Sequence, residues 1–154
     1  MKFFGFILCG SSLGLFLLTG CNSLPAGTPP DGEIVAQDNI TNIYSSASAV
    51  NYLITSLSAF AVKNVPQNST IAQQFDAPDK SLNFYPEKVY KTVAGIAKLN
   101  KVPAEGVGDF RLISCIKNVK GDSNILIWEM TLIHTPDSVK VWSETIKIDQ
   151  SKQE

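Results

Sequence analysis

Histidine, arginine and cysteine are scarce in this chain of 154 residues, and their scarcity excludes several kinds of site. The sequence has one histidine, one arginine and three cysteines that lie far apart. A zinc site takes about four cysteine, histidine or carboxylate ligands, so we expect no metal, and no pattern indicates a cofactor. The charges are scattered without a run of five of one sign, so the sequence indicates no nucleic-acid surface.

Motifs for catalysis are also missing. There is no Gly-flanked serine nucleophile, no P-loop and no dinucleotide fingerprint. His134 ends a predicted strand beside a proline turn, which is typical of a surface residue, and Asp109 is expected to cap the start of a strand. Glu129 and Glu144 fall on strands that would be neighbours, with Ser138 in the turn between them. We predict two surface carboxylates and no enzyme, with a wall glycosidase as the alternative.

The N-terminus carries the most informative pattern. Lys2 precedes an apolar run without charges over residues 3–18, and the segment ends in Leu17-Leu18-Thr19-Gly20-Cys21. This ending resembles the lipobox of bacterial lipoprotein precursors, which implies cleavage after Gly20 and a lipid on Cys21. So short an apolar run favours a signal peptide over a membrane-spanning helix, although an uncleaved anchor helix is the alternative.

The resemblance to the lipobox implies a location. A lipid with two or three acyl chains, of the palmitate type, holds a protein stably on a membrane, whereas one chain does not. Residue 22 is Asn rather than Asp. By resemblance to enterobacterial sorting, this favours the outer membrane, with the domain facing the periplasm. The membrane is therefore one expected partner, through the lipid anchor.

Four segments follow from these patterns. We predict a signal peptide (1–20), a lipidated cysteine with a flexible tether (21–37), a periplasmic domain (38–148) and a polar tail (149–154). The 134 residues left after cleavage suffice for one hydrophobic core. If lipid occupies Cys21, no second cysteine remains for Cys115, which we expect to be a buried, unpaired thiol.

Two helices are predicted. The first spans residues 38–60 with Asp38 as its N-cap, and the second opens at Pro86, where the missing N–H costs nothing. The polar face of the first helix is almost uncharged, and we interpret it as an ordinary solvated face, with contact with a partner as the alternative. Its candidate partner-binding residues are Asn42, Ser45, Ser48, Asn51 and Thr55.

The C-terminal part predicts strands over residues 110–119, 124–134 and 139–148, joined by short turns. Residues 63–80 are predicted to form a loop with a helical turn over 71–75, followed by a short strand over 81–85. The fold class is therefore α+β, a two-layer domain with a three-stranded antiparallel meander packed on two helices, with one or two extra edge strands left open. The strand face that packs under the helices should contain Leu126, Trp128, Met130 and Leu132.

Residues 89–148 resemble the core of the LpoB-type penicillin-binding-protein activator lipoproteins. The resemblance rests on Gly108-Asp109-Phe110-Arg111-Leu112 at the start of a strand and on Lys140-Val141-Trp142-Ser143-Glu144 in the last strand. The wider group includes the curli secretion-channel lipoprotein and the N-terminal domain of the Tol–Pal periplasmic protein. Trp142 is expected to be a core or sheet-face residue and Trp128 to lie on the face under the helices, with partner contact as the alternative for either.

The resemblance implies a non-enzymatic lipoprotein that binds and regulates a cell-envelope protein. Its family-based partner is a penicillin-binding protein, that is, a peptidoglycan synthase. The alternative function is a structural subunit of a secretion or envelope assembly.

Overall fold

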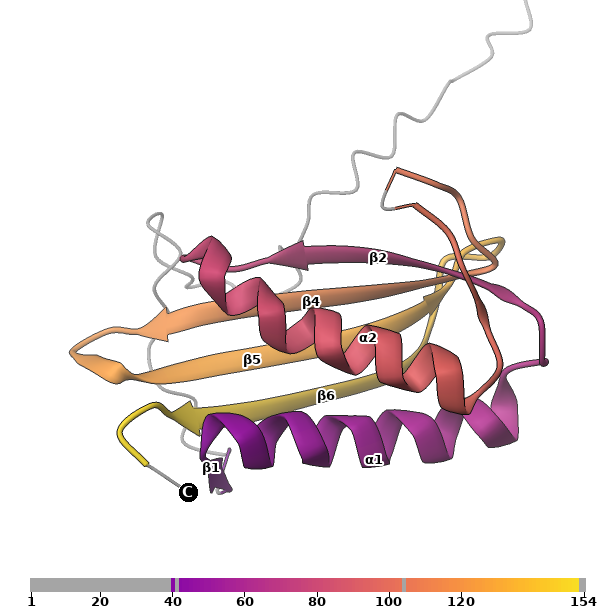
Figure 1. Ribbon diagram of the computed structural model, residues 1–154. Coiled ribbons are helices and arrows are strands. Elements are labelled where there is room, and N and C mark those ends of the chain that lie inside the picture. The colour runs from indigo at the N-terminus through magenta and orange to yellow at the C-terminus, as the bar shows by residue number, and fades with distance from the viewer. Residues whose placement is uncertain (1–39, 41, 104, 153–154) are drawn as a thin grey trace, which may run out of the picture.

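A computed structural model describes residues 40, 42–103 and 105–152 as a six-stranded sheet covered on one face by two helices (Figure 1). The predicted cleavage site, lipidated cysteine, tether and Asp38 cap lie outside these residues. In chain order the elements are β1 (Ile43–Tyr44), α1 (Ser46–Asn64), β2 (Thr70–Asp76), the 3₁₀ helix η1 (Lys80–Asn83), α2 (Phe84–Ile96), β3 (Asn100–Lys101), β4 (Phe110–Val119), β5 (Asp122–His134) and β6 (Val139–Asp149).

The predicted meander is confirmed. Strands β4, β5 and β6 pair antiparallel in sequence order and are the longest strands described. Strand β4 has the predicted bounds, whereas β5 begins two residues earlier and β6 ends one residue later than predicted. Figure 1 shows both helices side by side on the same face of the sheet. The α+β class with two layers is therefore confirmed.

The core lies between this sheet face and the helices. The four residues of β5 predicted to face the helices are each at most 3% exposed: Leu126, Trp128, Met130 and Leu132. They meet Leu53 and Leu57 of α1 and Val89 and Val93 of α2, all at most 1% exposed. Because side chains alternate along a strand, one register determines this whole face.

The first helix starts later than predicted. Residues Ile43 and Tyr44 form β1, which pairs parallel with Lys147 and Ile148 of β6. The chain then turns at Ser45, whose extended backbone and side-chain oxygen make it the N-cap of α1. The prediction from residue 38 was wrong at this end because pairing with β6, about 100 residues away in the chain, overrides the helical periodicity of residues 40–44.

The loop predicted for residues 63–80 was also wrong. Strand β2 lies within it and pairs parallel with β4 over six residues, Ile71 to Asp76. Parallel neighbours need a crossover connection, and α2 supplies it. Residues 81–85, predicted to form a strand, belong to η1 and to the start of α2. Pro86 is the third residue of α2, still in the first turn, where its missing N–H is tolerated.

The sheet is wider than the meander by three strands, in the order β1-β6-β5-β4-β2-β3. Strand β1 pairs with only two residues of β6, and β3 pairs with only two residues of β2. On the face away from the helices, Ile40 packs against Val119 and Ile127. The chain therefore enters the described domain across the outer face of the sheet.

Candidate functional site

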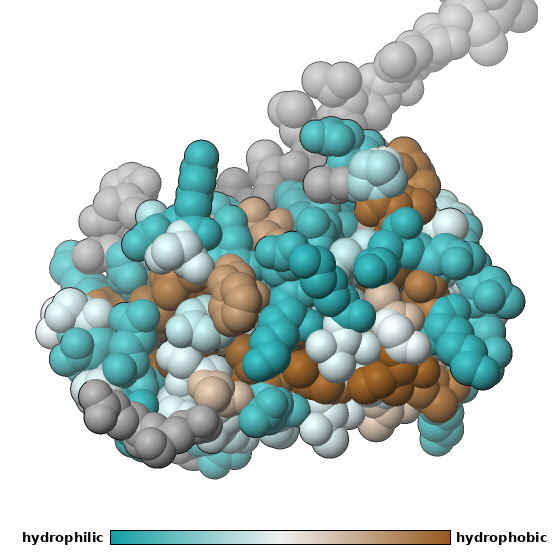
Figure 2. Space-filling model, viewed as in Figure 1, coloured by the Kyte–Doolittle hydropathy of each residue, from teal (hydrophilic) through white to brown (hydrophobic). Residues whose placement is uncertain are grey.

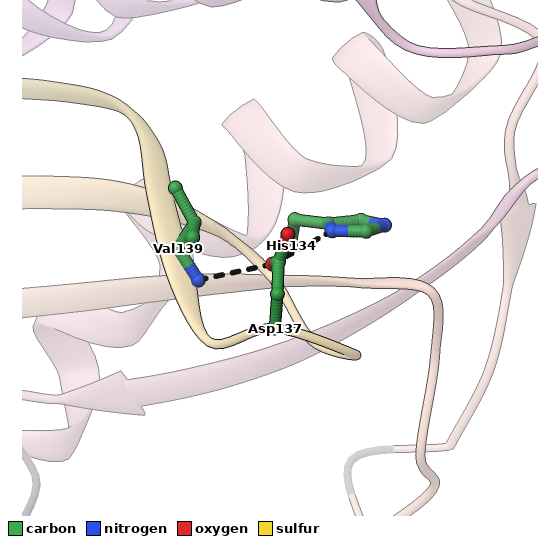
Figure 3. A network of polar contacts seen from close by, with 3 residues as sticks. All are labelled: His134, Asp137 and Val139. Carbon is green, nitrogen blue, oxygen red and sulfur yellow. Dashed lines mark hydrogen bonds and ion pairs between the residues drawn. The ribbon is translucent and has the colours of Figure 1, made fainter.

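The only histidine is part of a structural turn. His134 ends β5, and its Nδ1 lies 2.8 Å from Oδ1 of Asp137 (Figure 3). The same carboxylate oxygen accepts from the backbone N–H of Val139 at 3.2 Å, so it fixes the turn between β5 and β6. The hydrogen bond from His134 holds the pKa of Asp137 below its ordinary value. These contacts agree with the predicted surface residue.

Asp109 caps the start of β4, as predicted. Its Oδ2 accepts from both the backbone N–H and the hydroxyl of Thr70, each at 2.8 Å. In return, the hydroxyl oxygen of Thr70 accepts from the backbone N–H of Asp109 at 2.8 Å. The backbone hydrogen bond from Thr70 is the main cause that lowers the pKa of Asp109. The carboxylate therefore joins β2 to β4 and holds the sheet together.

The two glutamates of the alternative glycosidase interpretation are not brought together. Met130 is paired with Glu144, and Glu129 with Thr145, so the glutamates occupy opposite faces of the sheet. Glu144 lies on the helix side, where it accepts from Ser56 of α1 at 3.1 Å. Two carboxylates that flank a glycosidic bond must face one substrate, so this pair does not suit that chemistry.

The two tryptophans differ in exposure. Trp128 is 0% exposed, and its indole N–H donates to Oγ of Ser114 at 2.7 Å. Trp128 is therefore a core residue, as predicted, and the alternative of a partner contact is wrong for it. Trp142 is half-buried against the edge of the core. For Trp142, contact with a partner stays a prediction.

Cys115 is buried, at 4% exposed, as predicted, but it is not a free thiol. It forms a disulfide in this structure. The prediction of an unpaired cysteine was therefore wrong, because it counted neither Cys9 nor Cys21 as available for pairing. The two other cysteines, Cys9 and Cys21, lie outside the described residues.

The exposed face of α1 is the best candidate for a binding surface. Its residues recur at three- and four-residue steps and so form one strip along the helix, which we call the α1 strip: Ser48, Asn51, Tyr52, Thr55, Ala59 and Val62. The whole helix of 19 residues contains a single charged residue, Lys63. Tyr52 is 36% exposed and Val62 is 62% exposed. Water-facing helices usually carry more charge.

The neighbouring helix provides an internal comparison. α2 is shorter than α1, at 13 residues, but its exposed side carries Glu87, Lys88 and Lys91. Figure 2 shows this contrast, with teal side chains over the middle of α2 and mostly pale or brown ones along α1. Both helices belong to one layer, so the difference lies in their exposed faces and not in their packing against the sheet.

Of the five predicted partner-binding residues, Ser48, Asn51 and Thr55 lie exposed on α1. Asn42 is exposed but precedes β1, and Ser45 is the half-buried N-cap of α1, so the prediction that they lie on the helix face was wrong for these two. Their role in binding stays a prediction. The prediction missed Tyr52 and Val62, although neither belongs to the apolar periodicity of the helix. Both could have been predicted as exposed apolar residues, because they lie outside the periodic stripe of apolar residues that the helix buries.

Tyr52, in the N-terminal half of the α1 strip, packs against a second aromatic ring. The ring of Tyr52 stacks on Tyr44 of β1, with centroids 5.2 Å apart and planes 25° apart. The pKa of Tyr52 is raised above its ordinary value, mainly by partial burial and secondly by the nearby carboxylate of Glu144. A preorganised aromatic side chain loses little entropy on binding, which suits an interface anchor.

Other kinds of site receive no support from the residues the structure describes. Within residues 40, 42–103 and 105–152, no group of three or more histidine, cysteine or acidic side chains is placed to hold a metal ion. Over the same ranges, no helix has the length and apolarity needed to cross a membrane.

Comparisons with known proteins give two solved structures. No family model and no curated protein matches the chain. The LpoB C-terminal domain from Salmonella enterica is 13% identical, with a TM-score of 0.49, over 70% of this chain and 100% of that one. The LpoB C-terminal domain from Escherichia coli is 12% identical, with a TM-score of 0.45, over 64% and 98%. Both are of the kind that the sequence resembles, whereas the relation to the curli and Tol–Pal proteins stays a prediction.

Proposed function

We propose that this chain is a lipid-anchored periplasmic protein that binds and regulates another envelope protein, without being an enzyme itself. The observation that carries the proposal is the α1 strip, an exposed and almost uncharged helix face beside a charged one. A helix face with few charges loses little hydration free energy when a partner covers it. Tyr52 and Val62 supply apolar area to such a contact.

A peptidoglycan synthase of the penicillin-binding type is the proposed partner. The segments Gly108–Leu112 and Lys140–Glu144, which resemble LpoB-type activator lipoproteins, support this choice. The lipobox pattern ending at Cys21 supports the same compartment, since such synthases act in the periplasm. The proposed membrane is the outer one, because residue 22 is Asn.

Capture from native membranes tests the partner and the surface together. The full chain, carrying an affinity tag after Glu154, is purified with its bound proteins, which are then labelled with fluorescent penicillin. We expect labelled synthases with the unaltered chain and about tenfold less with Thr55→Arg, since a new charge within an interface core is poorly tolerated. Ile96→Arg, on the exposed end of α2, is the matched control and should leave capture unchanged. Equal loss in both variants, or no labelled protein at all, would contradict the proposal.

Mass spectrometry of the chain from its native host tests the anchor. We expect residues 1–20 to be absent and Cys21 to carry a diacylglycerol thioether with a further acyl chain. One sulfur atom does not hold both a thioether and a disulfide. A disulfide of Cys115 within the native chain needs Cys9 or Cys21 as its partner, so finding one would contradict cleavage after Gly20 with lipid on Cys21.

A second function, as a structural subunit of an envelope assembly, is favoured by the sheet edges. Strand β6 has 11 residues but pairs with β1 at only two of them, and β2 pairs with β3 at only two. Among the described residues, most of both edges therefore has no neighbouring strand, and such edges pair readily with other chains. Light scattering after size exclusion separates the two functions: a monomer favours the regulator, and a stable ring or polymer favours the subunit.

A further inference from the structure

The exposed side of α2 carries a shallow hollow that the proposed partner surface does not use. It has a volume of about 270 Å³ and is lined by Phe84, Glu87, Lys88, Lys91 and Thr92. All five side chains come from the first three turns of α2. The hollow is therefore built on one rigid element, and its geometry does not depend on a loop.

An aromatic ring borders this hollow. Phe84 is 64% exposed, although it is the first residue of a well-packed helix. Its ring meets Tyr85 at an angle of 68°, with centroids 5.9 Å apart, and Tyr85 in turn packs 6.5 Å from the buried Trp128. Exposure of a ring that is positioned in this way is typical of a surface that receives a flat apolar face.

Charges around the hollow favour an anion. The ammonium of Lys91 is paired with the carboxylate of Glu87 at 2.6 Å. Lys88 is exposed in α2, one turn before Lys91, and Lys80 is exposed in η1 just before the helix. Asp79, the nearest other carboxylate in the sequence, accepts from the backbone N–H of Ser81 and so caps η1. The hollow thus combines one ion pair with additional positive charge on a chain whose formal net charge is −1.

We propose that this hollow binds one sugar of the cell-wall glycan, peptidoglycan, together with a carboxylate of the peptide attached to it. A pyranose ring offers a C–H face that stacks on Phe84, and its hydroxyl groups donate to Glu87 and exchange hydrogen bonds with Thr92. A free carboxylate of the attached peptide accepts from Lys88 and Lys91. The hollow has about the volume of one sugar residue, below the range of pockets for larger ligands. The choice of glycan rests on the proposed periplasmic location.

An anionic membrane is the other surface that lysines and an exposed ring would suit, but the path of the chain favours the wall. The described domain begins at Ile40, which packs against Val119 and Ile127 on the face of the sheet opposite α2. The proposed lipid on Cys21 lies upstream of Ile40. The segment that leads to the proposed anchor therefore joins the domain on its sheet side, opposite α2.

Pelleting with purified peptidoglycan tests the proposal. The full chain in nonionic detergent micelles is mixed with sacculi and centrifuged, and the bound fraction is measured over a range of protein concentrations and salt. We expect binding that weakens as salt rises, and about tenfold weaker binding for Phe84→Ala and for Lys88→Glu, the size of an interface hot spot. Lys140→Glu, an exposed lysine that the register places beside Ile133 on the opposite sheet face, changes net charge equally and should bind normally.

Three outcomes would overturn this inference: no pelleting with sacculi, an equal loss with Lys140→Glu, or no loss with either variant of the hollow. A fourth comes from hydrogen exchange of residues 84–92 in the chain reconstituted into vesicles. Protection that requires phosphatidylglycerol in phosphatidylcholine vesicles, without pelleting by sacculi, would assign the hollow to the membrane. Thr55→Arg should not affect pelleting, so failure of this site and failure of the α1 strip are separate results.

Discussion

The buried hydrogen bond between Trp128 and Ser114 gives the sharpest test of the core. Both residues are 0% exposed, and the indole nitrogen lies 2.7 Å from the serine oxygen. Ser114→Ala removes this acceptor and leaves the N–H of Trp128 buried without a partner. We expect a loss of about 1–3 kcal/mol in the free energy of unfolding, the cost of an unsatisfied buried donor.

A double-mutant cycle separates the hydrogen bond from packing. Trp128→Phe alone should cost less than the roughly 3–5 kcal/mol of a truncation to alanine, because most of the ring volume is kept. In the Trp128→Phe background there is no N–H to satisfy, so Ser114→Ala should cost almost nothing. The coupling between the two sites should therefore be about 1–3 kcal/mol.

Urea unfolding followed by circular dichroism measures this cycle, on the chain expressed without residues 1–20 and with Cys21→Ser. The slope of free energy against urea should be unchanged among the variants, so that midpoints report stability. A coupling near zero would refute the assigned hydrogen bond.

Three further predictions concern the sheet, two glycines and the α1 strip. The pKa of Asp109 is lowered in the folded chain. Its contribution to stability is therefore complete at pH values above the pKa that the carboxyl has in the unfolded chain, and it is lost as the pH falls through the pKa of the folded chain. The difference in stability between the unaltered chain and Asp109→Asn, measured by thermal unfolding, should therefore decrease in acid. A difference that stays constant with pH would contradict the capping role of Asp109. Gly108→Ala would place a Cβ 2.9 Å from the carbonyl oxygen of Phe110 and 3.0 Å from a second backbone atom, so urea unfolding should show a loss of about 1–3 kcal/mol. Gly95→Ala meets nothing within 4 Å in α2 and should gain about 0.5–1 kcal/mol, so equal effects of the two changes would be evidence against the described backbone. Thr55→Arg on the exposed strip should change stability by less than about 0.5 kcal/mol, and a larger loss would mean that reduced capture reflects unfolding.

The candidate sites show where sequence reasoning is limited. Alternation along β6 places Glu144 toward α1, and only its pairing with β5 shows that Glu129 lies on the other face. The low charge of the first helix is visible in the sequence, so the partner surface could be proposed from it. The hollow beside Phe84 was not predicted, because residues 81–85 were assigned to a strand, which would have pointed Phe84 and Tyr85 to opposite faces.

What the sequence determined by itself is local. The lipobox pattern is a contiguous string, the turn residues bound β4, β5 and β6, and the alternation of residues 126–132 identifies the face of β5 in the core. Each of these signals depends on neighbours within a few residues. A strand such as β4 is thus predicted almost to the residue.

Only the tertiary structure decided the parts that depend on distant partners. Strand β2 has two glutamines in its centre and no clear alternation, and it becomes a strand because β4 pairs with it from more than 30 residues away. Residues 43–44 form a strand instead of continuing the helix because they pair with β6. Backbone hydrogen bonds between strands do not depend on side-chain type, so no sequence pattern in either segment predicts this pairing. The arrangement of two helices in one layer follows from that pairing, because α2 is the crossover between β2 and β4.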